Sequence, residues 1–397
     1  MVNISDSESI NSKEAILLSI IVPTKNREPV LRPLIRALLT WPEHFLIEFV
    51  IHDNSDKPLE LNEFNDPRLV YIHSSEEMDM GKNFDTAILA SRGEFICIIG
   101  DDDLVLPNAY EIAASMKARD LLAATCEVST YYWPGVCSHW VKENPNGVLI
   151  LKDMALGDRL GKVENGLYKI LEKGGVRYEG YLPSVYQGIV SRDLLVNLTE
   201  ELGTAFPGPS PDIANAVAIS GKYSTYLVAP SFIVSGYVLG SGGAEGAAKK
   251  HHGELASRAY MFNEGKLEWP AIVPRFFSGV TIWAATILIT LKKQSRAASC
   301  DQFNSAALLA YCIVYHPKYI YRILDVIRTH GDKSMVMNVG LRVTRVLLER
   351  LSIYVDNFKL RFSFLGSGTS KYGFIAGLSD TYEVHKYMKK HFNNKGE

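Results

Sequence analysis

The sequence predicts an α/β protein with a mixed, mostly parallel sheet and helices on both of its faces. Two observations support this: short, almost continuously apolar runs alternate with helix-like stretches, and turn-forming residues close each run. Strands that are apolar throughout are typical of parallel sheets that helices cover on both sides. The chain of 397 residues is long enough for two domains, or for one large domain with an appendage.

The strands expected in the first 110 residues are short and rich in β-branched or aromatic residues. They are residues 17–22, 47–52, 69–72 and 95–99. Helices are expected between them, at residues 30–39 and 82–90, where apolar residues recur at helical spacing.

The rest of the chain is predicted to be mixed at first and then helical. Strand-like runs lie within residues 122–132 and 226–238, and residues 212–219 have helical spacing directly after a Pro/Gly-rich stretch. Residues 240–253 are rich in Gly and Ala and predict a flexible loop, and the pattern is helical from about residue 270 to the end.

Composition excludes several classes of protein. A net charge of −2 argues against a general affinity for nucleic acid, and five scattered cysteines without a CxxC pair argue against a disulfide framework or a zinc knuckle. The polar N-terminus predicts no signal peptide, so we expect a cytoplasmic protein. The longest apolar run, residues 276–291, is shorter than the roughly 20 residues of a membrane span and predicts a buried helix.

Residues 317–361 are locally basic, with nine Lys or Arg against four acids. The simplest interpretation is a solvated helix face. Peripheral contact with the inner face of a membrane, or homo-oligomer formation through the C-terminal helices, are the alternatives.

Polar clusters follow three of the expected strands, at residues 23–27, 53–55 and 100–103. Since ligands of open α/β sheets bind at the carboxyl ends of the strands, these clusters predict one site. The last of them contains Asp101, Asp102 and Asp103, whose mutual repulsion favours a neutralising cation. Mg²⁺ and Mn²⁺ suit such oxygen ligands, although an acidic turn that caps a helix would also explain the run.

Four motifs stand in order along this half of the chain: PTKNR after the first strand, HDNS after the second, MGKNFDTAILASRGEFI, and GDDD followed by LVLP. In this arrangement the sequence resembles glycosyltransferase family 2, closely over residues 17–110 and more loosely to about residue 228. The resemblance implies the GT-A fold. It also implies a domain over residues 1–265, with a nucleotide-binding half at about 15–110, an acceptor half at about 111–240 and a flexible loop at 240–253. A helical C-terminal region, 266–397, follows.

The resemblance assigns the donor site residue by residue. It implies that Pro23, Thr24 and Arg27 line the nucleotide pocket, and that Asp53 holds the base. Gly81, Lys82 and Asn83 are expected near the base and the diphosphate. Asp101 matches a ribose contact and Asp102 the metal ligand, with Asp103 beside them as a donor-site residue and second ligand.

Two positions depart from the family pattern, and the order of roles among the three aspartates is open as a result. Gly100 stands where the family has the first aspartate of its D-x-D-D form, and Lys82 stands where the family often has arginine. Lysine still supplies a positive charge to a phosphate, but without the bidentate geometry of arginine.

The acceptor side is predicted from the same resemblance. Family 2 enzymes typically invert the anomeric carbon with a carboxylate base at a helix start, and Asp212 after Pro211 matches that position. Its alternative is a helix N-terminal carboxylate without a catalytic role. Asp85 and Glu179 are weaker candidates for the base.

Two further groups of side chains are considered for the site. His252, or its neighbour His251, is a candidate third metal ligand, although adjacent histidines on a loop are more often solvated. Four aromatic residues fall in the region expected to meet the acceptor sugar, although each is also compatible with core packing. They are Trp133, Tyr178, Tyr181 and Tyr186.

The predicted function is metal-dependent, inverting transfer of a sugar from a nucleoside diphosphate donor, with uridine as the expected base, to a hydroxyl of a glycan or lipid-linked acceptor in surface polysaccharide synthesis. One alternative is a nucleotidyltransferase, but its glycine-rich loop is missing after the first strand. A dehydrogenase would require GxGxxG there. The third alternative is a non-catalytic binding or scaffold protein on a degenerate transferase fold.

Overall fold

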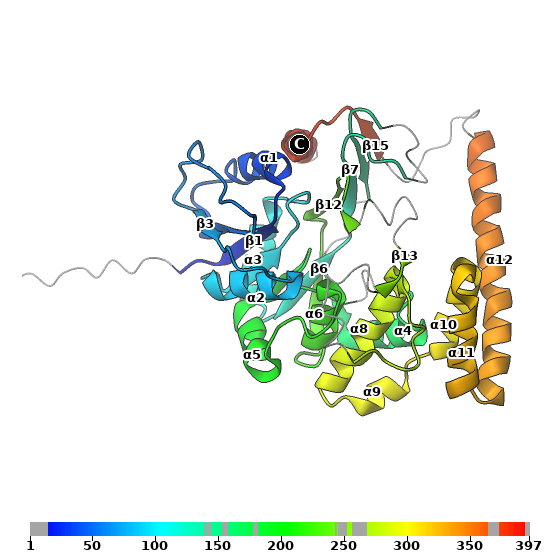
Figure 1. The fold of residues 1–397 in the computed structure, drawn as a ribbon. Helices are drawn as coiled ribbons and strands as arrows, with labels where there is room; N and C mark the ends of the chain where they lie inside the picture. Colours follow the sequence, from blue (N-terminus) through cyan, green and yellow to red (C-terminus); the bar gives the residue numbers. More distant parts are fainter. Residues whose placement is uncertain are drawn as a thin grey trace, which may run out of the picture.

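The computed structural model describes residues 15–138, 141, 144–152, 158–177, 182–242, 244, 252–255, 268–363 and 373–393, with the backbone alone for 353–363 and 391–393. The main sheet has eight strands in the order β3-β2-β1-β4-β10-β6-β11-β9 (Figure 1). The strands are β1 (Leu18–Thr24), β2 (Ile47–Asp53), β3 (Leu69–His73), β4 (Phe95–Ile98), β6 (Ala123–Cys126), β9 (Arg159–Lys162), β10 (Ile189–Ser191) and β11 (Thr225–Ala229). β3, β2, β1 and β4 are parallel, and β10 is antiparallel to both of its neighbours.

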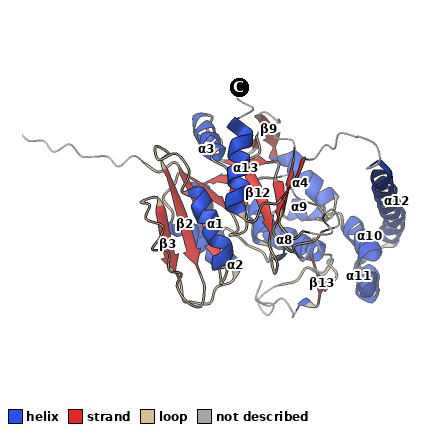
Figure 2. Cartoon of the chain, turned by 90° about the horizontal axis from the view of Figure 1, so that it is seen from above, coloured by secondary structure: helices blue, strands red, loops and turns tan. Residues whose placement is uncertain are grey.

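Helices cover both faces of this sheet, and Figure 2 shows strands enclosed between them. Alternate residues of β1 belong to different cores: Ile21 packs in the cluster that contains Phe84 of α2 (Met80–Ala90), whereas Ile20 packs in the cluster that contains Leu34 of α1 (Glu28–Leu38). The first cluster also holds α4 (Val163–Glu172), α5 (Arg192–Leu202) and α6 (Pro211–Ile219), and the second holds α3 (Asn108–Ala118). The predicted α/β class, with helices on both faces of a mixed sheet, is therefore confirmed.

A second sheet continues from the carboxyl side of the first. Its order is β15-β8-β7-β12-β5, with β5 (Leu104–Val105), β7 (Ser129–Tyr132), β8 (Val148–Leu151), β12 (Ile233–Tyr237) and β15 (Gly373–Ala376). Because β4 belongs to the first sheet and β5 to the second, the three consecutive aspartates form the link between the two sheets.

The C-terminal region is mostly helical, as predicted. Its helices are α8 (Gly279–Lys293), α9 (Ala297–Asp301), α10 (Ser305–Tyr315), α11 (Ile320–His330), α12 (Lys333–Ser363) and α13 (Thr381–Asn393), with a 3₁₀ turn at Pro317–Tyr319. α8 contains most of the apolar run 276–291 and is buried along most of its length, as expected. In the part of the chain that the structure describes, no helix is long and apolar enough to cross a membrane.

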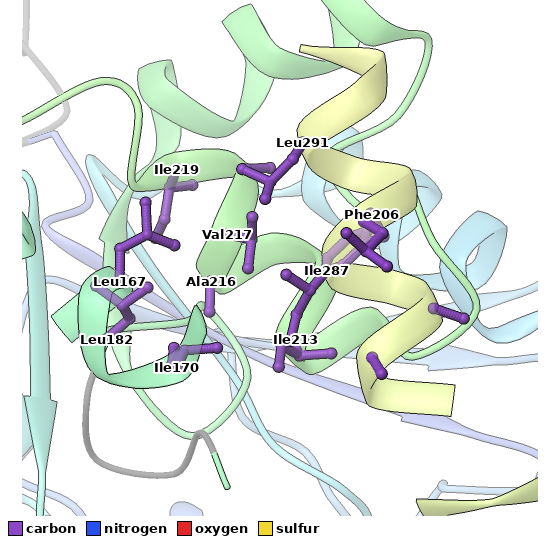
Figure 3. Close-up of a cluster of buried hydrophobic side chains, with 14 of the residues drawn as sticks. Leu167, Ile170, Leu182, Phe206, Ile213, Ala216, Val217, Ile219, Ile287 and Leu291 are labelled. Atoms are coloured by element: carbon purple, nitrogen blue, oxygen red, sulfur yellow. The ribbon is translucent and has the colours of Figure 1, made fainter. Parts of the chain in front are cut away.

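The predicted boundary at residue 265 does not separate two cores. Figure 3 shows Ile287 and Leu291 of α8 packed against Ile213 and Val217 of α6. The sequence also did not predict that the chain would return to the first half: β15 pairs with β8, and α13 packs on α1. The helix that carries Asp212 is thus held in place by residues beyond the expected domain.

A buried histidine fixes α13 to α1. His385 is 2% exposed, and its Nε2 lies 2.8 Å from Oγ1 of Thr40 at the end of α1. Burial, with Lys389 nearby, lowers the pKa of His385 from 6.5 to about 4. The folded state therefore disfavours the protonated imidazole.

We expect this histidine to make stability depend on pH between about 6.5 and 4. In that window the unfolded chain binds a proton that the folded chain does not, so stability falls as the pH falls. Relative to His385→Gln, the wild type should lose roughly 2 kcal/mol of unfolding free energy between pH 7.5 and pH 5. Urea unfolding of both proteins at pH 7.5 and pH 5 measures this loss of unfolding free energy. Equal losses in the wild type and in His385→Gln would contradict the prediction.

Candidate active site

The link between β4 and β5 gathers the three aspartates, all almost completely buried. Asp101 is 2% exposed, Asp102 6% and Asp103 1%. Burial raises the pKa of Asp101 to about 7 and that of Asp103 to about 6, and it also raises the pKa of Asp102. Since desolvation penalises the charged form of a carboxyl, the site requires compensating charge or hydrogen bonds.

Arg27 supplies that compensating charge for two of the aspartates. Its Nη1 lies 2.7 Å from Oδ1 of Asp101, and its Nη2 lies 3.3 Å from Oδ2 of Asp102. Thr24, at the end of β1, donates from Oγ1 to Oδ2 of Asp101 at 2.7 Å. The loop after β1 is thus tied to the link after β4, as the meeting of strand ends predicts.

Asp103 is held by hydrogen bonds from several elements. Its Oδ2 accepts from the backbone N–H of Gly100 at 2.8 Å, and its Oδ1 accepts from that of Gly236 in β12 at 2.8 Å. The Tyr186 hydroxyl and the Gln187 amide donate to Oδ2 at 3.0 Å and 2.9 Å. Three donors converge on Oδ2 and one bonds Oδ1, so Asp103 is tied to both sheets and orients the link. Its role as a second metal ligand stays a prediction.

Asp102 has a different environment. Its Oδ2 faces Arg27 and accepts weakly from the N–H of Val238 at 3.3 Å, and its backbone carbonyl accepts from Nε1 of Trp133 at 3.1 Å. One guanidinium cannot balance three carboxylates, so full ionisation of the three aspartates requires a further positive charge at the site. Such a site fits a divalent cation that takes one carboxylate from Asp102 and the remaining ligands from a diphosphate and water.

His252 is not assembled with these carboxylates in the structure. It lies in β13 (His252–Gly253), paired with β14 (Phe277–Ser278), and its ring is 6.3 Å from that of His316. Among the residues that the structure describes, no group of three or more His, Cys, Asp or Glu side chains is arranged to hold a metal ion. The predicted ligand set of Asp102, Asp103 and His252 is therefore not brought together, and His251 lies outside the described residues.

Asp53 is placed at the sheet edge but faces its own loop. It is fully buried, and its Oδ1 accepts from the N–H of Ser55 at 2.8 Å. Its Oδ2 accepts from the hydroxyl of Tyr71 at 2.7 Å and from the N–H of Leu59 at 3.3 Å. In this arrangement Asp53 shapes the turn after β2, and Pro23, in the pairing of β1 with β2, lies half-buried beside it.

The predicted segment Gly81-Lys82-Asn83 forms the first turn of α2. The Asp79 side chain caps the helix by accepting from the N–H of Lys82 at 2.8 Å, while the Lys82 ammonium pairs with Glu76. Asn83 is buried, and its Oδ1 lies 2.6 Å from Nδ1 of His52 in β2. Lys82, half exposed, is therefore the member of this segment that a phosphate can reach.

Asp212 lies at the first turn of α6, as predicted, and its side chain accepts from the Ser210 hydroxyl at 2.5 Å. Its charge contributes to raising the pKa of Tyr186, after the larger effects of burial, Asp103 and Asp102. Tyr186 is therefore close enough to Asp212 and to the aspartate link for the charges of both to act on its hydroxyl. The weaker candidate Asp85 is instead bonded to Thr204 and Ala205, and Glu179 lies outside the described residues.

Sequence reasoning did not assign Gln187 or Gly236 to the site, and it considered Tyr186 only as a platform for sugar. Gln187 has a left-handed backbone (φ 59°), which is uncommon for a residue other than glycine. It also bridges Asp103 to the Ser235 hydroxyl at 2.9 Å.

Trp133 is buried, and Tyr178 and Tyr181 lie outside the described residues. No sequence motif pointed to the contacts of Tyr186, Gln187 and Gly236 with Asp103, because these residues are more than 80 positions away from it in the sequence.

Comparisons with known proteins find relatives for part of this chain. Residues 19–154 match the family described as Glycosyl transferase family 2. The putative colanic acid biosynthesis glycosyl transferase WcaA of Escherichia coli (strain K12) is 28% identical over 123 residues, which are 30% of this chain and 44% of that relative. The matched segment thus spans less than half of the curated relative.

The solved structures found include TarS 1–349 of S. aureus. It has a TM-score of 0.43 and 14% identity, over 79% of this chain and 90% of that one. The complex of the same protein with UDP-GlcNAc has a TM-score of 0.42 and 15% identity, over 79% and 81% of the two chains.

The family match covers residues 19–154, which include the loop after β1 and the aspartate link. The resemblance inferred from the motifs is therefore confirmed over this segment. The mixed, mostly parallel sheet with helices on both faces agrees with the expected fold class.

Gly236 is the residue at which we expect the link to be most sensitive to substitution. A Cβ there would lie 1.6 Å from the backbone carbonyl oxygen of Asp102, so Gly236→Ala should displace β12 or the link and cost several kcal/mol of stability. Gly340→Ala is the control: it meets nothing within 4 Å in a helix, and it should stabilise the protein by about 1 kcal/mol. Thermal unfolding measures both, and an equal effect of the two substitutions would contradict the close approach.

Proposed function

We propose that this protein transfers a sugar from a nucleoside diphosphate donor to a hydroxyl of a glycan or lipid-linked acceptor in surface polysaccharide synthesis. The observation that carries the proposal is the convergence of the buried aspartate link, Arg27 and Asp212 within and beside the matched family 2 domain. The name of the relative WcaA supports the polysaccharide pathway.

The donor is proposed to lie along the carboxyl edge of β1, β2 and β4, with uridine as the base. Lys25, Asn54 and Ser55 line a hollow of about 300 Å³ on this edge, together with Glu76 and Glu77. Lys82 pairs with Glu76 at its rim, so its ammonium is close enough to exchange that carboxylate for a phosphate.

Metal dependence is proposed through Asp102. Mg²⁺ or Mn²⁺ would neutralise the charge that develops on the diphosphate as it leaves. Arg27 is already held beside Asp102, and it supplies a second positive charge without any rearrangement of the loop after β1. We place Asp101 beside the ribose, and we keep Asp103 as the residue that orients the link.

Asp212 is proposed as the base that takes the proton of the acceptor hydroxyl. Pro211 and Asp212 begin α6, whose buried face packs between α8 and the main sheet, so the carboxylate has a rigid support (Figure 3). The Ser210 hydroxyl orients one oxygen of Asp212. An inverting transfer requires such a base on the face opposite the leaving group.

Donor binding should require Asp102 and a divalent cation. We expect a nucleoside diphosphate to raise the melting temperature in the presence of Mn²⁺, because a ligand that binds only the folded state stabilises it by mass action. Asp102→Asn should lose the Mn²⁺-dependent part of this shift.

Glu63→Gln, which alters an exposed carboxylate that pairs with Arg32, is the control and should keep the shift. If no nucleotide raised the melting temperature of the wild type, the proposed donor site would be wrong, and a binding or scaffold role would become the better explanation.

Asp212 should affect the chemical step and not donor binding. Asp212→Asn keeps the size of the side chain but removes the base, so kcat should fall by about 10²- to 10⁴-fold while the nucleotide-induced shift remains. Asp85→Asn is the matched control, since Asp85 is bonded to Thr204 and Ala205. Unchanged turnover in Asp212→Asn would contradict the assignment of Asp212 as the base.

A further inference from the structure

The helix α12 is apolar on two opposite sides. On one side Val339 is buried in the main core, and Val343 packs against the same core, where α12 lies along α10. The other side exposes large apolar side chains to solvent, each with 60% to 65% of its surface accessible. They are Met337, Leu341, Leu348 and Leu351. A helix that only completes its own protein's core needs one apolar face.

The exposed side has a regular spacing. Met337, Leu341, Thr344, Leu348 and Leu351, which we call the α12 seam, follow one another at intervals of four, three, four and three residues. The sequence continues the same intervals with an apolar residue at 355, 358 and 362. This 3.5-residue repeat is the pattern by which two helices pack side by side, each filling the spaces between the other's side chains.

Within the described residues, α10 is the main element in contact with α12, and it lies on the side away from the seam. Figure 1 shows α12 at the edge of the molecule, running past the ends of α10 and α11. The helix has 31 residues and is therefore about 46 Å long. A seam of this length, on the outside of the molecule, can meet another molecule without hindrance from the main sheet.

Residues 333–363 carry six Lys or Arg against two acids, and two of the three arginines before residue 351 are engaged within the chain. A helix that binds an anionic membrane carries Lys and Arg along its polar face. Here Arg350 is turned away, with Nη1 3.2 Å from the carbonyl oxygen of Val314 and its guanidinium over the ring of Tyr315. Arg345 is paired with Glu349 one turn further along.

We propose that α12 binds the α12 helix of a second copy of this chain, so that the protein is a homodimer joined along the α12 seam. An identical helix is the partner whose repeat matches the seam along its whole length. The same surface on both copies also gives a closed, two-fold interface. This proposal does not depend on the proposed reaction, because no residue of the aspartate link takes part in the seam.

The test is the mass of the full-length protein in solution, measured by light scattering during size-exclusion chromatography over a wide range of concentrations. The wild type should have twice the 44.2 kDa mass of one chain. Leu341→Glu/Leu348→Glu should reduce the mass to that of one chain while circular dichroism and the core of the monomer are unchanged, because both side chains are exposed.

Arg342→Glu is the matched control. It changes the net charge by the same two units on the same helix, at a position that neither belongs to the seam nor flanks it, and it should leave the dimer intact. A wild type with the mass of one chain at all concentrations would overturn the proposal, and so would a Leu341→Glu/Leu348→Glu variant that remains dimeric. Monomeric wild type that co-floats with phosphatidylglycerol vesicles would assign the seam to a membrane instead.

Discussion

The ion pairs of Arg27 with Asp101 and Asp102 compensate the buried charge on which the rest of the site depends. Three adjacent carboxylates, none more than 6% exposed, could not remain ionised together without a positive charge among them. Removal of Arg27 would leave two buried carboxylates without their paired charge, which is unfavourable, although solvent screens part of this cost because the Arg27 side chain is 33% exposed. These ion pairs therefore hold the loop after β1 to the link after β4.

The three aspartates have different roles under this constraint. Asp103 accepts from Gly100, Tyr186, Gln187 and Gly236, which join both sheets to the link. Asp101 is fixed between Thr24 and Arg27. Asp102 has fewer side-chain partners, since its Oδ2 faces Arg27 and accepts only weakly from Val238, and so it is the carboxylate that we propose as the cation ligand.

The first four strands and the order of the motifs could be predicted from the sequence, because β1, β2 and β4 are short apolar runs that end at Pro23, at the turn 53–55 and at Gly100. The contacts of Tyr186 and Gln187 with Asp103 could not be predicted, because they depend on the antiparallel insertion of β10 beside β4. The pairing of β15 with β8 could not be predicted either, because the two strands lie more than 200 residues apart in the sequence. The occupied oxygens of Asp53 and Asp103 are also properties of the folded loop and not of the residue type.

The C-terminal helices are then best understood by what each one stabilises. α8 packs on α6 and supports the helix start that carries Asp212, and α13 packs on α1, directly after the loop that carries Arg27. Both therefore stabilise elements of the site from outside the matched family 2 domain. α12 contacts neither α6 nor α1 to a comparable extent, and its exposed seam contributes nothing to the core of its own chain. Four large apolar side chains held in water by a folded helix are an unfavourable arrangement unless a second surface covers them.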